Sequence, residues 1–152
     1  MAASNKEVIE MLTTAYNMEL ETVTNYLAAS INLDGVRAEE IKKSLAADVT
    51  GELAHAQQLG NRIKQIGGAA PGSQKLKFTQ TSLQPSSNST DVVSVIKAVI
   101  EAEEAAIAHY KKIIKATDGE DYVTQDMAIK LLTDEEAHVV LFRGFLKEYT
   151  QS

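Results

Sequence analysis

The feature that most constrains this chain is an approximate internal repeat of acidic, aromatic and histidine residues. Its members are Glu19, Tyr26, Glu52 and His55 in the first half, and Glu103, Tyr110, Glu135 and His138 in the second. In both halves Glu and Tyr are seven positions apart, and the second Glu follows the first by 33 or 32 positions. This symmetry indicates that each half contributes the same supersecondary unit to one shared structure.

Apolar residues recur around these positions at the spacing of an α-helix. Helices are predicted over about residues 4–34, 36–66, 90–118 and 122–149. A Ser4–Glu7 capping box opens the first, and the chain turns at Asp34-Gly35 and again at Gly67-Gly68. Both prolines lie within residues 67–90, which therefore form a crossover. The chain is predicted to be an all-α four-helix bundle of two antiparallel hairpins joined by this crossover.

We expect residues 1–152 to form a single domain, because neither half looks able to fold alone. A linker between two domains is the alternative interpretation of residues 67–90. The net charge of −6 argues against a nucleic-acid partner, and the lack of Cys excludes disulfides, thiolate metal sites and iron–sulfur clusters. No stretch approaches the roughly 20 apolar residues of a membrane span. A cytoplasmic location without a membrane partner is expected.

The polar members of the repeat fall on the apolar faces of the predicted helices. Charged groups on a core face are costly unless something compensates them, and two divalent cations would balance four carboxylates. Glu-x-x-His also presents a carboxylate and an imidazole on one helix face. The candidate ligands are Glu19, Glu52, His55, Glu103, Glu135 and His138. Mixed oxygen and nitrogen ligation suits iron or manganese. A metal-free polar core with satisfied hydrogen bonds is the alternative.

The third helix offers three acidic residues for one position. The repeat and the helix face favour Glu103, while Glu101 and Glu104 are expected to flank the site or face water. His109 lies off the Glu103 face and is expected at the surface. Tyr26 and Tyr110 lie two turns from their Glu residues, where they could donate hydrogen bonds or an electron. A role as core aromatics with a satisfied hydroxyl is equally open.

Three segments resemble ferritin-like di-iron proteins, and bacterioferritins in particular. They are residues 17–26, residues 121–127 and the motif Asp134-Glu-Glu-Ala-His138. The resemblance implies a ferritin-like fold with Glu52 and Glu135 bridging two metals, Glu19 and Glu103 as terminal ligands, and one His on each metal. It also implies an acid that orients each His. Asp134 is placed to reach His55, but Gly51 occupies the symmetric position, so His138 needs another partner.

The function implied by the resemblance is oxidation of Fe(II) with O₂ or H₂O₂, for iron storage or detoxification. Glu52, Glu135, Tyr26 and Tyr110 are then the candidate catalytic residues. A peroxide-consuming dimetal enzyme, similar to rubrerythrin or manganese catalase, and a non-enzymatic metal-binding bundle remain alternatives. Bacterioferritins bind haem through a Met at the position of Leu53, so no haem is expected. The apolar run at 139–142 favours a homo-oligomer, at least a dimer.

Overall fold

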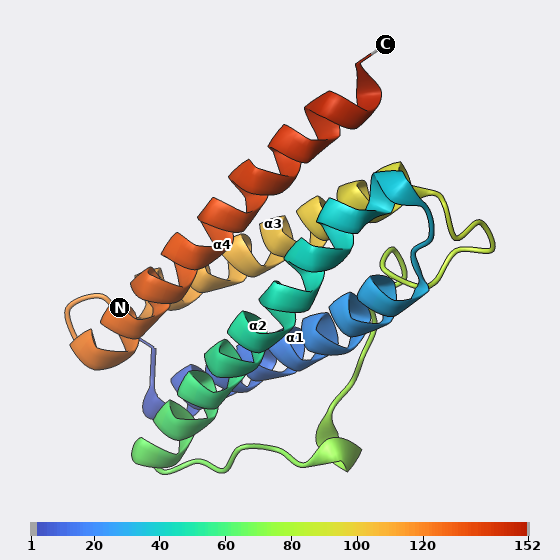
Figure 1. The fold of residues 1–152 in the computed structure, drawn as a ribbon. Coiled ribbons are helices and arrows are strands. Elements are labelled where there is room, and N and C mark those ends of the chain that lie inside the picture. Colours follow the sequence, from blue (N-terminus) through green and yellow to red (C-terminus); the bar gives the residue numbers. More distant parts are fainter. Residues whose placement is uncertain (1–2, 152) are drawn as a thin grey trace.

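The computed structural model describes residues 3–151, and the regular structure within this range is entirely helical (Figure 1). The four long helices are α1 (Asn5–Asn32), α2 (Glu39–Gln65), α3 (Val92–Thr117) and α4 (Tyr122–Thr150). Two single turns of 3₁₀ helix, η1 (Val36–Ala38) and η2 (Ser73–Lys75), lie in the connections. The predicted fold class, a four-helix bundle with a long crossover, is confirmed. None of the helices in this range combines the length and apolar character needed to cross a membrane.

Short polar side chains begin three of the four long helices. Ser4 accepts a 3.2 Å hydrogen bond from the Glu7 amide at the start of α1, as predicted from the capping box. Asp91 and Asp121 accept the equivalent hydrogen bonds at the starts of α3 and α4. The first helix was predicted to continue to residue 34, two residues beyond its observed end at Asn32. Gly35, with φ of 100°, directs the chain into η1 instead of capping α1.

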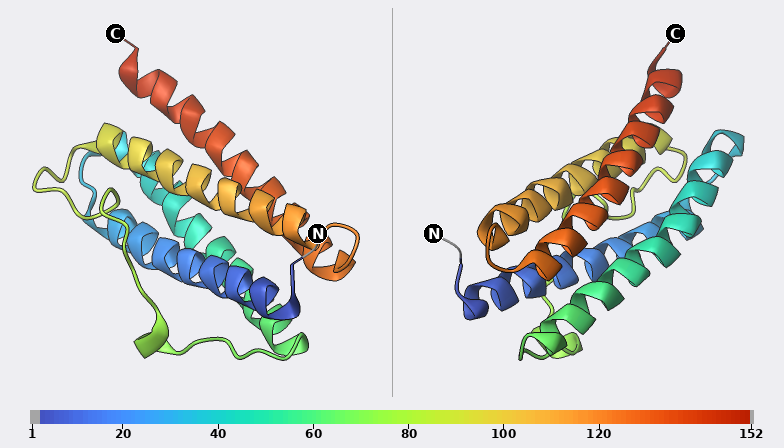
Figure 2. Two further views of the ribbon diagram at one scale, coloured as in Figure 1. Left: turned by 180° about the vertical axis from the view of Figure 1, so that it is seen from behind. Right: turned by 90° about the vertical axis from the view of Figure 1, so that its left-hand side faces the viewer.

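The helices pair as two hairpins, α1 with α2 and α3 with α4, and α1 also packs against α3. The crossover runs from the end of α2 to the opposite end of the bundle, as both views in Figure 2 show. Three α1 residues spaced by four positions hold it. Asn17 exchanges two hydrogen bonds with the backbone of Lys77. Glu21 accepts a 2.6 Å hydrogen bond from the Gln80 amide, and Asn25 donates to the Gln80 side chain.

Two separate groups of apolar side chains form the core. One gathers around Ile41, Leu45, Ile96 and Phe142, and the other around Leu12, Leu59, Ile63 and Ile113. Buried acidic residues lie between them, at the level where the helical stripes are interrupted. Tyr26 belongs to the first group and Tyr110 to the second. The fold therefore places a polar layer across the middle of an otherwise apolar bundle.

Candidate metal centre

The structure brings all six predicted ligand residues together in this polar layer, with every long helix contributing. The residues form two groups, Glu19, Glu52, His55 and Glu135, and Glu52, Glu103, Glu135 and His138. Within each group, one potential ligand atom per residue lies within 4.8 Å of all the others. Glu52 from α2 and Glu135 from α4 belong to both groups, so the two groups are adjacent and share a pair of carboxylates.

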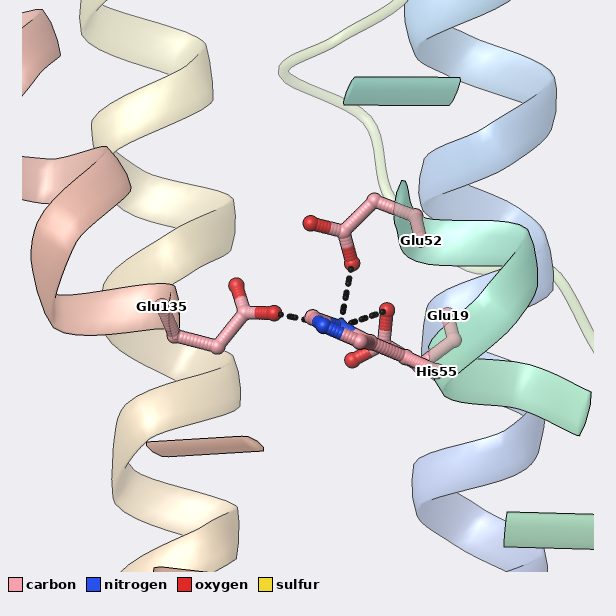
Figure 3. Close-up of side chains that lie close together, drawn as sticks. All are labelled: Glu19, Glu52, His55 and Glu135. Atoms are coloured by element: carbon pink, nitrogen blue, oxygen red, sulfur yellow. Dashed lines mark ion pairs between the residues drawn. The ribbon is translucent and has the colours of Figure 1, made fainter. Parts of the chain in front are cut away.

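The first group surrounds the ring of His55 (Figure 3). Its Nδ1 atom lies 3.1 Å from Glu135 Oε1, 3.4 Å from Glu52 Oε2 and 3.6 Å from Glu19 Oε2. These carboxylates come from three different helices and point toward the same nitrogen. Glu52 and His55 share one face of α2 because they are three residues apart. The arrangement gathers three oxygens and one nitrogen around a single point.

The second group has the same composition but is more open. The Nδ1 atom of His138 lies 3.3 Å from Glu52 Oε1, 3.6 Å from Glu103 Oε1 and 4.0 Å from Glu135 Oε2. The His138 side chain is 21% exposed, whereas that of His55 is 6% exposed. His138 is therefore the more exposed of the two histidines, whereas Glu52, Glu103 and Glu135 beside it are buried.

Each imidazole turns its other nitrogen toward an aspartate. His55 Nε2 lies 2.9 Å from Asp134 Oδ2, so the predicted contact across the bundle is confirmed. His138 Nε2 lies 3.6 Å from Oδ1 of Asp48, a residue that the sequence reasoning did not identify. The sequence did hold one sign of this contact, because Asp48 lies four residues before Glu52 and therefore on the same face of α2.

Each tyrosine of the repeat donates a hydrogen bond to a glutamate of the other half. Tyr26 donates to Glu103 Oε1 and Tyr110 donates to Glu19 Oε1, both at 2.5 Å. Burial raises the pKa of both phenols well above the ordinary value, so both remain protonated donors. The expected hydrogen bonds are present, and both tyrosines also lie in the apolar core, as the alternative interpretation expected. A catalytic role and the transfer of an electron stay predictions.

The buried atoms of the centre lack the hydrogen bonds that a metal-free polar core would need. Among residues 3–151, seven buried side-chain atoms have no hydrogen-bond partner: Glu19 Oε2, Asp48 Oδ2, Glu52 Oε1, His55 Nδ1, Glu103 Oε2, Glu135 Oε1 and His138 Nδ1. Six of them belong to the six candidate ligands, one atom from each. An unpaired buried carboxylate or imidazole nitrogen is costly, and a cation in each of the two groups would satisfy all six. The donor set therefore fits two metal ions of the iron or manganese kind.

The same crowding changes how these groups hold protons. Burial raises the pKa of Glu19 to about 8, with the nearby Glu52 carboxylate adding to the effect. Burial alone would lower the pKa of His55, but Glu19 and Glu52 outweigh it and raise the pKa to about 11. The Glu103 and Glu52 carboxylates raise the pKa of His138 to about 10. Without a cation, the centre holds protons in its place.

The other residues considered on the third helix lie outside the centre. Glu101 and Glu104 are both exposed, as expected, and Glu104 pairs with Arg143 at 2.5 Å. His109 was expected at the surface, but its ring is half-buried and Nε2 lies 2.8 Å from the backbone oxygen of Met11. The surface prediction was wrong because α1 packs against this part of α3.

The fold and the centre together define a four-helix bundle with a carboxylate- and histidine-lined pair of sites, as in dimetal carboxylate proteins. The family model of the ferritin-like domain matches residues 9–152, and the chain belongs to this family.

Known proteins of the family match most of the chain. A bacterioferritin of Desulfovibrio desulfuricans is 25% identical over 148 residues, covering 93% of this chain and 78% of that protein. A DNA protection during starvation protein of Pyrococcus furiosus is 26% identical over 145 residues, covering 93% of this chain and 77% of its own length. Among solved structures, a dodecameric thioferritin related to bacterioferritin, from Bacteroides fragilis, has a TM-score of 0.85 at 23% identity. That match covers 97% of this chain and 88% of the thioferritin chain.

Proposed function

We propose that the six clustered residues bind two iron ions, and that the protein oxidises Fe(II) with O₂ or H₂O₂ for iron storage or detoxification. One observation carries this proposal. Each of the six side chains has a buried atom without a hydrogen-bond partner, and the six form two adjoining groups that share the carboxylates of Glu52 and Glu135. Relatives that are a bacterioferritin and a starvation-protection protein support the same class of function.

The positions of the side chains support a distinct role for each. Glu52 and Glu135 belong to both groups and would bridge the two ions. Glu19 and Glu103 each belong to one group and would be terminal ligands. In each of these two glutamates, Oε1 accepts a hydrogen bond from a tyrosine and Oε2 has no hydrogen-bond partner. His55 and His138 would complete one ion each through Nδ1.

Bound iron would supply the redox chemistry, and the chain would supply orientation and charge. The hydrogen bonds from Tyr26 and Tyr110 fix the two terminal carboxylates. Apolar side chains on both sides of the polar layer keep bulk water away from it, which strengthens the attraction between carboxylates and cations. The partly exposed ring of His138 is the place where small oxidants would approach the centre.

The test is Fe(II) oxidation by purified protein, followed by stopped-flow absorbance after mixing with O₂ or H₂O₂. Glu52→Ala and Glu135→Ala should abolish the fast phase, because each removes a carboxylate from both groups. Glu103→Gln should slow it strongly, whereas Glu101→Gln, a matched change on the exposed side of α3, should not. Unchanged rates in the Glu52 and Glu135 variants would refute the assignment.

The same experiment separates the alternatives. A peroxide-consuming enzyme would turn over H₂O₂ repeatedly with iron or manganese bound, while reacting slowly with O₂. A centre that holds metal for structure only would bind two ions and oxidise Fe(II) no faster than buffer does. The partly exposed ring of His138 favours a reactive centre over a closed structural one.

Assembly and haem belong to the same proposal. We expect a homo-oligomer, at least a dimer, because Val140 and Leu141 are 70% and 45% exposed on α4. The similar Bacteroides fragilis protein is a dodecamer.

We expect no haem at the position of Leu53, because a leucine side chain has no atom that ligates iron. The net charge of −6 disfavours nucleic acid as a partner.

A further inference from the structure

The two imidazoles of the centre are oriented alike, although the aspartates beside them occupy different positions in the two halves of the repeat. Both rings direct Nδ1 toward the carboxylates and Nε2 toward an aspartate. For His55 this aspartate is Asp134, which directly precedes Glu135 on α4 and lies 2.9 Å away. An aspartate at Nε2 fixes the ring and keeps the proton there, so that Nδ1 is free to bind a cation.

The other half of the repeat cannot repeat this contact from the same position. The residue before Glu52 is Gly51, which has no side chain. Asp48 lies almost one turn earlier on α2, and its Oδ1 atom is 3.6 Å from Nε2 of His138. Its other oxygen, Oδ2, is buried without a hydrogen-bond partner. Asp48 thus occupies the side of His138 that Asp134 occupies at His55.

We propose that Asp48 is the positioning residue of His138, in place of the acid that position 51 lacks. This inference rests on the proposed metal centre. A hydrogen bond needs a separation of about 3.2 Å or less, so a shift of roughly half an ångström closes the contact. Asp48 then accepts the Nε2 proton of His138 and aims Nδ1 at the group formed with Glu52 and Glu103. The longer contact and greater exposure make this half of the centre the weaker of the two.

The proposal predicts which metal-binding step each aspartate controls. Loss of an acid that orients a histidine ligand typically weakens metal binding by about 10–100-fold. Asp48→Ala should weaken one of two binding steps by this factor and leave the other unchanged. Asp134→Ala, the matched change at His55, should weaken the opposite step.

The experiment is an anaerobic titration of the metal-free protein with Co(II), read from its visible absorption bands and from calorimetry. Wild type should take up two ions per chain in distinguishable steps. In a His138→Ala background, where the weaker group has lost its imidazole, Asp48→Ala should have no further effect on the remaining step. Folding of each variant is checked by circular dichroism of the metal-free protein.

A rescue variant separates positioning from a general loss of charge. A Cβ atom added at Gly51 meets no atom of the described residues within 4 Å, so the backbone there has room for the start of an Asp side chain, and Gly51→Asp is the rescue variant. Combined with Asp48→Ala, it should restore the weakened step toward the wild-type affinity. Wild type that binds two ions while Asp48→Ala leaves both affinities unchanged would overturn this inference alone. Wild type that binds no Co(II) would instead overturn the metal centre itself.

Discussion

The hydroxyl of Tyr26 in α1 donates a 2.5 Å hydrogen bond to Oε1 of Glu103 in α3. Tyr110 in α3 makes the reciprocal contact with Glu19 in α1. Each half of the repeat thus holds the first glutamate of the other half in place. This crossed arrangement explains why the tyrosines keep the same seven-residue spacing from their own glutamates. It also ties the geometry of the centre to the packing of α1 against α3.

Removing one of these donors should weaken the centre without unfolding the protein. Tyr26→Phe leaves Glu103 Oε1 without a partner, and a hydrogen bond to a charged group contributes about 1.5–3 kcal/mol. We expect the affinity for one of two Co(II) ions to fall by about tenfold or more, measured by calorimetry. Tyr16→Phe, in the same helix with its ring near Gly60, is the control and should bind as wild type. Equal affinities combined with slower Fe(II) oxidation would assign Tyr26 to electron transfer instead.

Metal binding should release protons, and its affinity should rise with pH. The raised pKa of Glu19, about 8, and those of His55 and His138, about 11 and 10, mean that these groups hold protons at neutral pH when no cation is present. A cation must displace those protons. Titration of the weakly buffered protein with Zn(II), followed with a pH indicator, should show acidification. Binding without proton release would contradict the account of the centre's protonation.

The metal-free protein should lose stability as pH rises. The pKa of Glu19 increases from 4.5 in the unfolded chain to about 8, so its contribution is complete below pH 4.5 and lost by pH 8. The two histidines also stabilise the folded protein while they are protonated, and this contribution is lost between pH 6.5 and about 10 for His138 or about 11 for His55. The Tm measured with a chelator present should therefore fall between pH 5 and 9, and less steeply in Glu19→Gln. A Tm that rises across this range would be incompatible with these shifts.

The crossover should depend on the acidic side chain that holds it. Glu21 is buried and accepts the hydrogen bond of the Gln80 amide, so Glu21→Ala leaves a backbone donor unpaired. The expected loss in the free energy of unfolding is about 1–3 kcal/mol. Limited proteolysis should cut residues 76–84 faster in this variant than in wild type. Glu10→Ala, an exposed change on the same helix, should leave both measurements unchanged.

Most of the fold and the centre follow from period and pattern in the sequence. The four helices, the crossover and the six clustered residues were all predicted, because buried Glu and His interrupt strongly periodic apolar stripes. The role of Asn17, Glu21 and Asn25 in holding the crossover was not predicted. Their contacts are with residues about 60 positions away, and a single sequence carries no signal for that register.

Asp48 and His109 were missed for related reasons. Asp48 breaks the symmetry of the repeat, so comparing the two halves directs attention to Gly51 and away from it. His109 lies on a face of α3 that the spacing of apolar residues predicts to be exposed to solvent. Only the packing of α1 buries it beside the Met11 backbone.

The central claim is that the protein binds two metal ions, one at each group, and that the carboxylates of Glu52 and Glu135 contact both ions. Crystals soaked anaerobically in Fe(II) and measured at the iron absorption edge test it directly. The account predicts two anomalous peaks per chain, one within coordination distance of His55 Nδ1 and one of His138 Nδ1, with both carboxylates reaching between them. An absence of peaks among these six side chains, with iron bound elsewhere on the chain, would contradict it.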